Sequence, residues 1–387
     1  MSVRDLIYLD HAATTPPRPE ALRAMWPFLT TEFGNPSSHH GVGESARAGL
    51  AAARRAIADT LGVRPDELVF TSGGTEADNL AVKGIALGAL SSGRPARVLT
   101  TRLEHSAVAG STAYLRRFHD IGTDHLTCDG SGLVDPEELD SLIRPDTVLV
   151  SVQAANNEVG TVQDLEALSA VCRRHGVPLH TDAVQAAGQL DIRPSALAVD
   201  ALSLSGHKLG APRGTGLVWL RSSVPVEPLI HGGGQQRSRR SGSEDVAGAV
   251  ALATALVSAE SERASTAERM TRLRDGFIGR VLATVPGARL TGHPTRRLPG
   301  NASFVIDGVN GETVLIELER RGIICSSGSA CAAGSQDPSP VLLAMGIGED
   351  LARTALRFSL GRATTEADLA AAAGELAAVV AALRHGS

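Results

Sequence analysis

Apolar runs and helical periodicity alternate along the first 220 residues of the chain. Short runs rich in Val, Leu and Ile predict buried strands, and apolar positions three or four residues apart predict helices. The expected strands are 6–10, 68–71, 97–101, 124–128, 147–152, 177–180, 199–204 and 214–220, and the expected helices are 19–29, 44–61, one that opens at 72–79, 106–118 and 136–143. This alternation is typical of an α/β protein with a doubly wound sheet.

The pattern changes after a long helix expected at 244–282. Strands at 302–306 and 355–359 are then interspersed with helices at 312–321, at 338–345 and from 365 onward, which suggests a smaller α+β domain. We therefore predict a large domain at 10–255 and a small domain at 256–387 that is completed by residues 1–9.

Composition limits the classes of function. The chain has 387 residues, which is long enough for two domains. Its net charge is -5, and it has no long basic run that would suggest binding to nucleic acid. Its Ala-rich runs are interrupted by charged residues and do not approach the ~20 apolar residues of a membrane span. The first residues have no apolar signal core, so we expect a soluble, cytoplasmic protein. Its four cysteines, which lack CxxC spacing, are expected to be free thiols: Cys128, Cys172, Cys325 and Cys331.

One lysine lies at a chemically favourable place. The chain has two lysines, Lys83 and Lys208, and Lys208 follows the apolar run 199–204, where an α/β sheet presents its strand ends to a ligand. An amine can form a Schiff base, whereas a guanidinium stays protonated. Taken alone, Lys208 is better explained as a surface residue that follows a strand.

A glycine-rich turn connects the strand 68–71 to the next helix. Gly73 and Gly74 allow backbone N–H groups to approach an anion at the positive end of that helix, and Thr75 and Asp78 have capping-box spacing. The turn therefore predicts a phosphate site, with a tight strand-to-helix connection as the alternative.

Further polar residues follow three other strands of the predicted sheet. His105 follows 97–101, Asn157 follows 147–152, and Asp182 and Gln185 follow 177–180. We expect them along one edge of the sheet. Each also has a structural interpretation: Asn157 as a turn former, His105 as a capping or core residue, and Asp182 as a helix cap.

The combination of an amine, a carboxylate, a phosphate site and an imidazole matches the needs of pyridoxal 5'-phosphate. Lys208 would hold the aldehyde of the cofactor, and Asp182 would keep its ring nitrogen protonated, so that the ring can draw electrons from a substrate. Gln185 could bind the ring hydroxyl.

Ordered motifs over nearly the whole chain resemble those of the cysteine desulfurases, a class-V aminotransferase-like branch of the fold-type I pyridoxal-phosphate enzymes. The motifs that carry this resemblance are Tyr8 to Thr15, Gly34 to Ser38, Phe70 to Glu76, Asn156 to Gly160, Ser205 to Lys208, Arg240 to Gly242 and Ser326 to Cys331. The apparent length of the Cys331 loop is similar to that of the housekeeping iron-sulfur, or nitrogen-fixation, group.

The resemblance implies a homodimeric fold-type I transferase with a large mixed sheet. Such an enzyme converts L-cysteine to L-alanine through an aldimine and a ketimine of the cofactor, and it leaves a persulfide on Cys331. The sulfur then passes to an acceptor protein, either an iron-sulfur scaffold or a thiolation enzyme. Neither direct nucleic-acid binding nor a metal site is expected.

The resemblance also implies a role for each matched residue. Lys208 would be the aldimine lysine, His105 would stack on the ring and move protons, and Asp182, Gln185 and Asn157 would hold the ring. Gly74, Thr75, Ser205 and His207 would bind the phosphate, and Asn35 and Arg357 would bind the substrate carboxylate. Ser243 would contact the phosphate in the partner subunit, at a position where the family usually has threonine.

Cys331 distinguishes the competing functions. It follows Ser326-Ser327-Gly328-Ser329-Ala330, a loop with almost nothing to bury, which favours a reactive thiol over a buried structural one. A selenocysteine lyase or another fold-type I enzyme would need the cofactor residues but not Cys331. A non-catalytic scaffold could keep the fold and the cofactor, but it would not need all four of Lys208, Asp182, His105 and Cys331. For Cys325 we favour a small apolar role.

Overall fold

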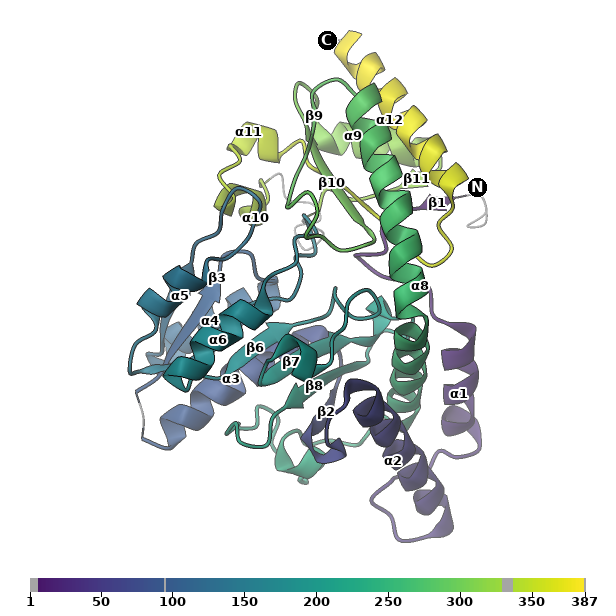
Figure 1. Ribbon diagram of the computed structural model, residues 1–387. Helices are drawn as coiled ribbons and strands as arrows, with labels where there is room; N and C mark the ends of the chain where they lie inside the picture. Colours follow the sequence, from purple (N-terminus) through teal and green to yellow (C-terminus); the bar gives the residue numbers. More distant parts are fainter. Residues whose placement is uncertain (1–5, 94, 329–336, 386–387) are drawn as a thin grey trace.

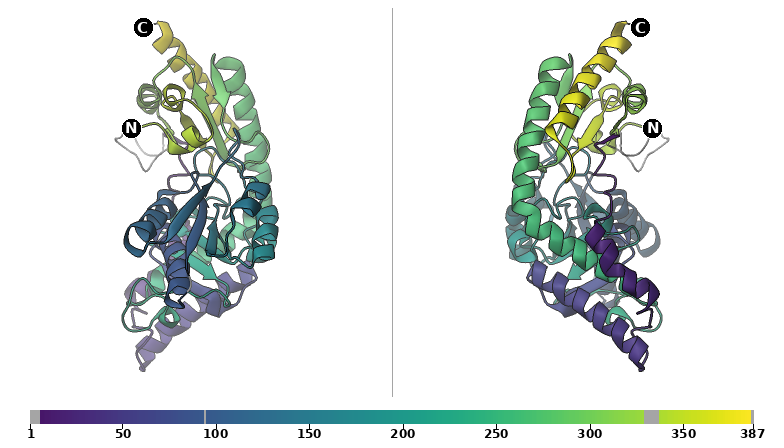
Figure 2. Two further views of the ribbon diagram at one scale, coloured as in Figure 1. Left: turned by 90° about the vertical axis from the view of Figure 1, so that its left-hand side faces the viewer. Right: turned by 90° about the vertical axis from the view of Figure 1, so that its right-hand side faces the viewer.

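The computed structural model describes residues 6–93, 95–328 and 337–385. They form one large sheet with helices on both faces and a second, smaller group of strands and helices (Figure 1). Helix α8 (Val246–Thr284) runs along both parts, and α12 (Glu366–His385) packs beside its C-terminal half (Figure 2).

The large sheet has seven strands in the order β2-β8-β7-β6-β5-β3-β4. Within it, β8 alone runs opposite to its neighbours, and the other strands share one direction. The strands are β2 (Leu68–Thr71), β3 (Arg97–Thr101), β4 (Gly122–Leu126), β5 (Thr147–Ser151), β6 (Leu179–Asp182), β7 (Ala201–Ser205) and β8 (Gly216–Leu220). The carboxyl ends of the parallel strands therefore share one edge.

Both faces of this sheet are buried under helices. Successive strand residues alternate between two cores: Val69 and Val98 pack under α3 (Gly74–Ser91) and α4 (Ser106–His119), whereas Leu68 and Leu99 pack on the other side. That other side is covered by α1 (Pro19–Thr30), α2 (Gly41–Leu61), α5 (Pro136–Leu142), α6 (Leu165–His175) and the first half of α8.

The second part is built around β10 (Asn301–Ile306), which pairs antiparallel with β9 (Ala288–Leu290) and with β12 (Leu356–Ser359). Its core holds Phe277, Phe304 and Phe358, whose rings meet edge to face with centroids 5.1–6.2 Å apart. A short parallel pair, β1 (Ile7–Tyr8) with β11 (Ile323–Ile324), brings the N-terminal segment to this part.

Shorter elements complete the chain. They are η2 (Pro65–Glu67), α7 (Pro194–Leu197), η3 (Gly206–Lys208), η4 (Gln236–Ser238), α9 (Gly311–Arg320), α10 (Pro340–Ala344) and α11 (Glu349–Ala352). In the described part of the chain, no helix combines the length and apolarity that a membrane crossing requires.

The predicted fold class is confirmed, and most elements lie within a few residues of their expected positions. Two strands are displaced by two residues: β6 occupies 179–182 and not 177–180, and β4 occupies 122–126 and not 124–128. It is an edge strand whose residues are mostly half-exposed, so its polar Thr123, Asp124 and His125 gave no apolar signal. The division at residue 255 stays a prediction.

The glycine turn after β2 depends on a second glycine in β8. A Cβ on Gly216 would lie 2.5 Å from the backbone of Gly73, which is far closer than any real contact. We expect Gly216→Ala to lower the free energy of unfolding by about 1–3 kcal/mol, because backbone must move to relieve the overlap. Denaturant unfolding measures this change.

Gly276→Ala is the matched control, since a Cβ on Gly276 in α8 has open space around it. Alanine is a better helix former by about 1 kcal/mol, so the control is expected to be stabilised. Equal unfolding midpoints for the two variants would contradict the steric argument.

Candidate active site

Four of the predicted site residues meet at the carboxyl edge of the large sheet. His105 follows β3, Asn157 follows β5, Asp182 ends β6, and Lys208 lies in η3 after β7. Because these strands are parallel neighbours, their ends converge, as expected from the sequence.

The Lys208 side chain is held by the N-terminal turn that follows β1. Its Nζ donates to the carbonyl oxygens of Ala12, at 2.5 Å, and Ala13, at 2.7 Å. Gln185 Nε2 donates to the same Ala12 oxygen at 3.0 Å. The turn is anchored further by Thr14, whose Oγ1 lies 3.1 Å from His207 Nδ1.

Sequence reasoning assigned no role to Ala12 and Ala13. The signal available was indirect: they belong to the motif Tyr8 to Thr15, which carries the family resemblance.

Asp182 is buried at this edge, with 8% of its surface exposed. Its Oδ1 accepts a hydrogen bond from Val184 N at 2.9 Å, so it caps a turn and not the helix that the structural alternative suggested. Burial raises the pKa of Asp182, while the Val184 N–H and the charges of His105 and Lys208 oppose that rise. The carboxyl group therefore lies where a cationic partner would favour its ionised form.

The glycine turn opens α3 without a side-chain cap. Gly73 has φ +155°, a conformation suited to glycine, and the helix begins at Gly74. The capping box expected from Thr75 and Asp78 was wrong. Glu76 instead accepts hydrogen bonds from the Ser72 backbone at 2.8 Å and its hydroxyl at 2.6 Å, and Asp78 turns toward the sheet.

The turn fits a phosphate group. Its first-turn N–H groups have no side-chain cap, and a Cβ on Gly74 would lie 3.0 Å from Val184 and 3.2 Å from Ser205, so glycine keeps the space between them open. Ser205 and His207 follow on β7 and η3. Together with the amine of Lys208 and the buried Asp182, these donors fit pyridoxal phosphate.

Arg357 lies in β12 and is 1% exposed. Its guanidinium donates to Asp10 Oδ1 at 2.8 Å, to Asn157 O at 2.9 Å and to Gly328 O at 3.1 Å. Its Nε has no hydrogen-bond partner among the described residues. Sequence reasoning missed Asp10 as the counter-ion of this arginine.

One predicted site residue, Asn35, lies apart from this group. Asn35 belongs to the loop between α1 and α2, and this loop lies at the lower end of the molecule in Figure 1. Its Oδ1 accepts a hydrogen bond from Ser37 N at 2.9 Å. Ser243 lines a small cavity beside the glycine turn together with Ser72 and Gly216. Cys331 lies outside the described residues.

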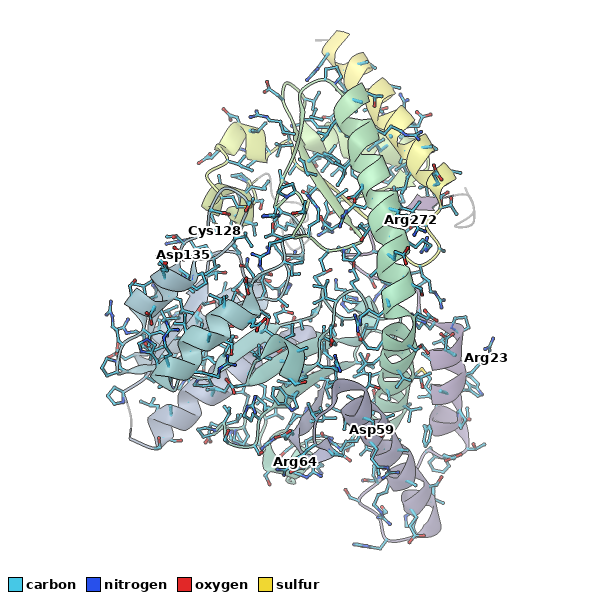
Figure 3. All side chains as sticks on the ribbon, viewed as in Figure 1. Arg23, Asp59, Arg64, Cys128, Asp135 and Arg272 are labelled. Carbon is cyan, nitrogen blue, oxygen red and sulfur yellow. The ribbon has the colours of Figure 1, made fainter. Side chains whose placement is uncertain are left out.

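The other three cysteines are free thiols, as predicted. Cys128, labelled in Figure 3, lies beside α10, and its Sγ donates to Ala344 O at 3.4 Å. Cys325 packs against the second core, and burial strongly raises the pKa of its thiol, in keeping with the small apolar role that we favoured.

Glu104, next to His105, is a buried acid that sequence reasoning did not single out. Its Oε1 accepts from Thr101 Oγ1 at 3.0 Å and from Gln153 N at 2.9 Å, whereas Oε2 has no partner among the described residues. Burial raises the pKa of Glu104 from 4.5 to about 8. The group is therefore mostly neutral at pH 7.

This raised pKa predicts how stability depends on pH. Between pH 4.5 and about 8 the folded protein holds a proton on Glu104 that the unfolded chain releases, so this contribution to stability is lost as pH rises. We expect the free energy of unfolding of wild type to fall relative to that of Glu104→Gln as the pH rises from about 5 to about 8. Denaturant unfolding at several pH values measures it.

Glu312→Gln, an exposed position on α9, is the control with the same change of charge. Parallel pH curves for wild type and Glu104→Gln would show that Glu104 does not titrate in this range.

Comparisons with known proteins agree with this site. Residues 7–371 match the model of the aminotransferase class-V family. An IscS-like cysteine desulfurase of Mycobacterium tuberculosis is 45% identical over 385 residues, 98% of each chain. A NifS-like protein of known structure superposes with a TM-score of 0.91 at 34% identity, covering 98% of this chain and 100% of that one.

A solved structure of SspA in complex with cysteine superposes with a TM-score of 0.79 at 34% identity, over 91% of this chain and 98% of that one. Both the sequence and the fold are thus shared over nearly the whole length. The chain belongs to the class-V aminotransferase family, among its pyridoxal-phosphate-dependent cysteine desulfurases.

Proposed function

We propose that this chain converts L-cysteine to L-alanine and captures the sulfur on Cys331. The exchange balances, since L-cysteine and the Cys331 thiol give L-alanine and a Cys331 persulfide. The observation that carries the proposal is the convergence of Lys208, Asp182, His105 and the Gly74 turn at one sheet edge. Pyridoxal phosphate, when bound, supplies an electron sink that weakens the bonds around the substrate α-carbon.

Each residue of the site has a separate role in this proposal. Lys208 supplies the amine that holds the cofactor, His105 stacks on the ring and moves protons, and Asp182 holds the ring nitrogen. Gln185 and Asn157 orient the ring. Gly74, Thr75, Ser205 and His207 bind the phosphate at the start of α3.

Arg357 receives the substrate carboxylate in this proposal. A guanidinium can donate five hydrogen bonds in a planar fork, which suits a carboxylate. Arg357 now donates to Asp10, Asn157 and Gly328, and its Nε is free of partners in the described structure. The substrate would displace one of these contacts, so Asp10 competes with it for Arg357.

Cys331 takes the sulfur. Gly328, three residues earlier, is bound through its carbonyl oxygen by Arg357, so the chain leading to Cys331 starts beside the proposed carboxylate site. A thiolate is the attacking form.

Replacing Cys331 tests this step. We expect Cys331→Ser to bind the cofactor and to react slowly with L-cysteine, but to yield no alanine by sulfur transfer, because a serine hydroxyl cannot form a persulfide. Alanine and reductant-released sulfide are assayed together, with the visible spectrum of the cofactor.

Cys128→Ser is the matched control, a second thiol outside the site, and it should keep wild-type turnover. Normal alanine release by Cys331→Ser would favour a selenocysteine lyase or another fold-type I enzyme. A wild-type protein that binds no cofactor would favour the interpretation of this chain as a non-catalytic scaffold.

We also propose a homodimer in the cytoplasm that passes its sulfur to an acceptor protein, either an iron-sulfur scaffold or a thiolation enzyme. An apolar stripe on α1 supports the dimer: Leu22, Trp26 and Leu29 are spaced along one helix face and are 44%, 64% and 56% exposed. Asn35, which lies apart from the site on its own chain, and Ser243, which lies beside the glycine turn, are proposed to serve the site of the partner subunit.

A charge in this stripe should separate the subunits. We expect Leu29→Glu to shift the protein toward monomer in sedimentation, because the carboxylate would be buried in the interface. Ile316→Glu on α9, 46% exposed, is the control and should leave the dimer intact. A wild-type monomer, or an unchanged Leu29→Glu dimer, would contradict the proposed interface.

A further inference from the structure

A group of buried polar side chains lies between α3 and the sheet, directly behind the proposed cofactor site. These side chains come from α3, from the turn after β3 and from three adjacent strands, and none is more than 8% exposed. They are Asp78, Glu104, Ser151, His180, Asp182 and Ser203. Burying so many polar groups is costly unless they satisfy one another.

His180 forms the neutral centre of this group. Its Nδ1 lies 2.9 Å from Ser151 Oγ, and its Nε2 lies 2.9 Å from Ser203 Oγ. Burial lowers the pKa of His180 to about 3, so the ring carries no charge at neutral pH. His180 Nε2 is 3.8 Å from Asp78 Oδ1, too far for a hydrogen bond, and thus is not a cationic partner for Asp78.

Asp78 instead meets another acid. Its buried Oδ1 receives no hydrogen bond from any described residue, and its carboxyl group lies within interaction reach of the carboxyl group of Asp182 and of Ser203. Two carboxyl groups in contact inside a protein cannot both be ionised, so the pair holds a proton.

The surroundings decide which acid holds that proton. Burial and the charge of Asp182 raise the pKa of Asp78 well above its usual value, and Glu104 adds to this rise. Asp182 accepts the Val184 N–H, and this hydrogen bond, His105 and Lys208 all act to lower its pKa. The proton therefore belongs on Asp78, and the negative charge on Asp182.

We propose that Asp78 is a positioning residue for the cofactor: as a neutral acid it donates a hydrogen bond to the Asp182 carboxylate and aims it at the ring nitrogen of pyridoxal phosphate. This inference rests on the proposed function, because it assumes that Asp182 meets that nitrogen.

The hydrogen bond affects where the ring proton resides. Asp182 and the ring nitrogen compete for one proton, and a donor on Asp182 makes its carboxylate less basic. With Asp78 in place the proton stays on the nitrogen, and the ring remains a good electron sink. Without this donor, burial makes Asp182 more basic and draws the proton away from the ring.

Three variants on α3 separate this role from a merely structural one. Asp78→Asn keeps the shape of the side chain and supplies an N–H donor that cannot ionise. Asp78→Ala removes the donor. Ser91→Ala removes a hydroxyl at the other end of α3, where it donates to Gly88 O at 3.1 Å.

The main measurement is the nitrogen NMR shift of pyridoxal phosphate labelled at its ring nitrogen and bound to each protein, together with the rate of cofactor release. We expect Asp78→Asn and Ser91→Ala to keep the wild-type shift of a protonated ring. In Asp78→Ala the shift should move toward that of an unprotonated ring, with release about tenfold faster, the effect of losing one hydrogen bond to a charged group.

Infrared spectroscopy locates the proton without relying on the alanine variant. We expect the wild-type carboxylic-acid absorption to decrease in Asp78→Asn, since one protonated acid is removed. An undiminished band would show that Asp78 is ionised and would overturn the proposal, whether or not Asp78→Ala folds.

Two NMR outcomes would also overturn it: a wild-type shift and release rate in Asp78→Ala, or loss of the ring proton in Asp78→Asn. If either result is found while wild type binds the cofactor with a protonated ring, the proposed function stands and only the role of Asp78 is contradicted. A wild type that does not bind the labelled cofactor would overturn both.

Discussion

The contact between Arg357 and Asp10 joins parts of the chain that are 347 residues apart. A buried guanidinium needs a counter-ion and acceptors for its remaining donors, and it finds them in three different segments. These are the turn after β1, the loop after β5 and Gly328. The same N-terminal turn provides the carbonyl oxygens that hold Lys208, so the second part of the molecule and the sheet edge depend on one buried charge.

The fold and the grouping of four candidate site residues were predictable because both follow from short-range patterns. A sheet buried on both faces gives apolar runs, and polar residues that follow these runs must gather at the carboxyl edge. His105, Asn157, Asp182 and Lys208 were found in this way. The apolar pattern is weaker at the edge strand β4, because its first residues are polar and did not indicate where the strand begins.

The remaining site residues could not be derived because their roles depend on three-dimensional neighbours. Ala12 and Ala13 act through backbone carbonyls, which have no side-chain signature. Asp78 had the spacing of a capping residue, but α3 begins at Gly74 and is buried on nearly every side, so this acid faces the sheet. The clue available in the sequence was an acid among the apolar residues Ala77, Leu80 and Ala81.

Helix α8 has 39 residues and contributes side chains to both hydrophobic cores, Leu252 and Leu256 to the first and Phe277 and Val281 to the second. At 1.5 Å per residue it is a rod of about 58 Å. Its middle turns, around residues 261–269, are less buried than its ends. Any hinge motion between the two parts must therefore bend a continuous helix, which is far stiffer than a loop. The helix thus holds Arg357 in one part and Lys208 in the other at a set separation.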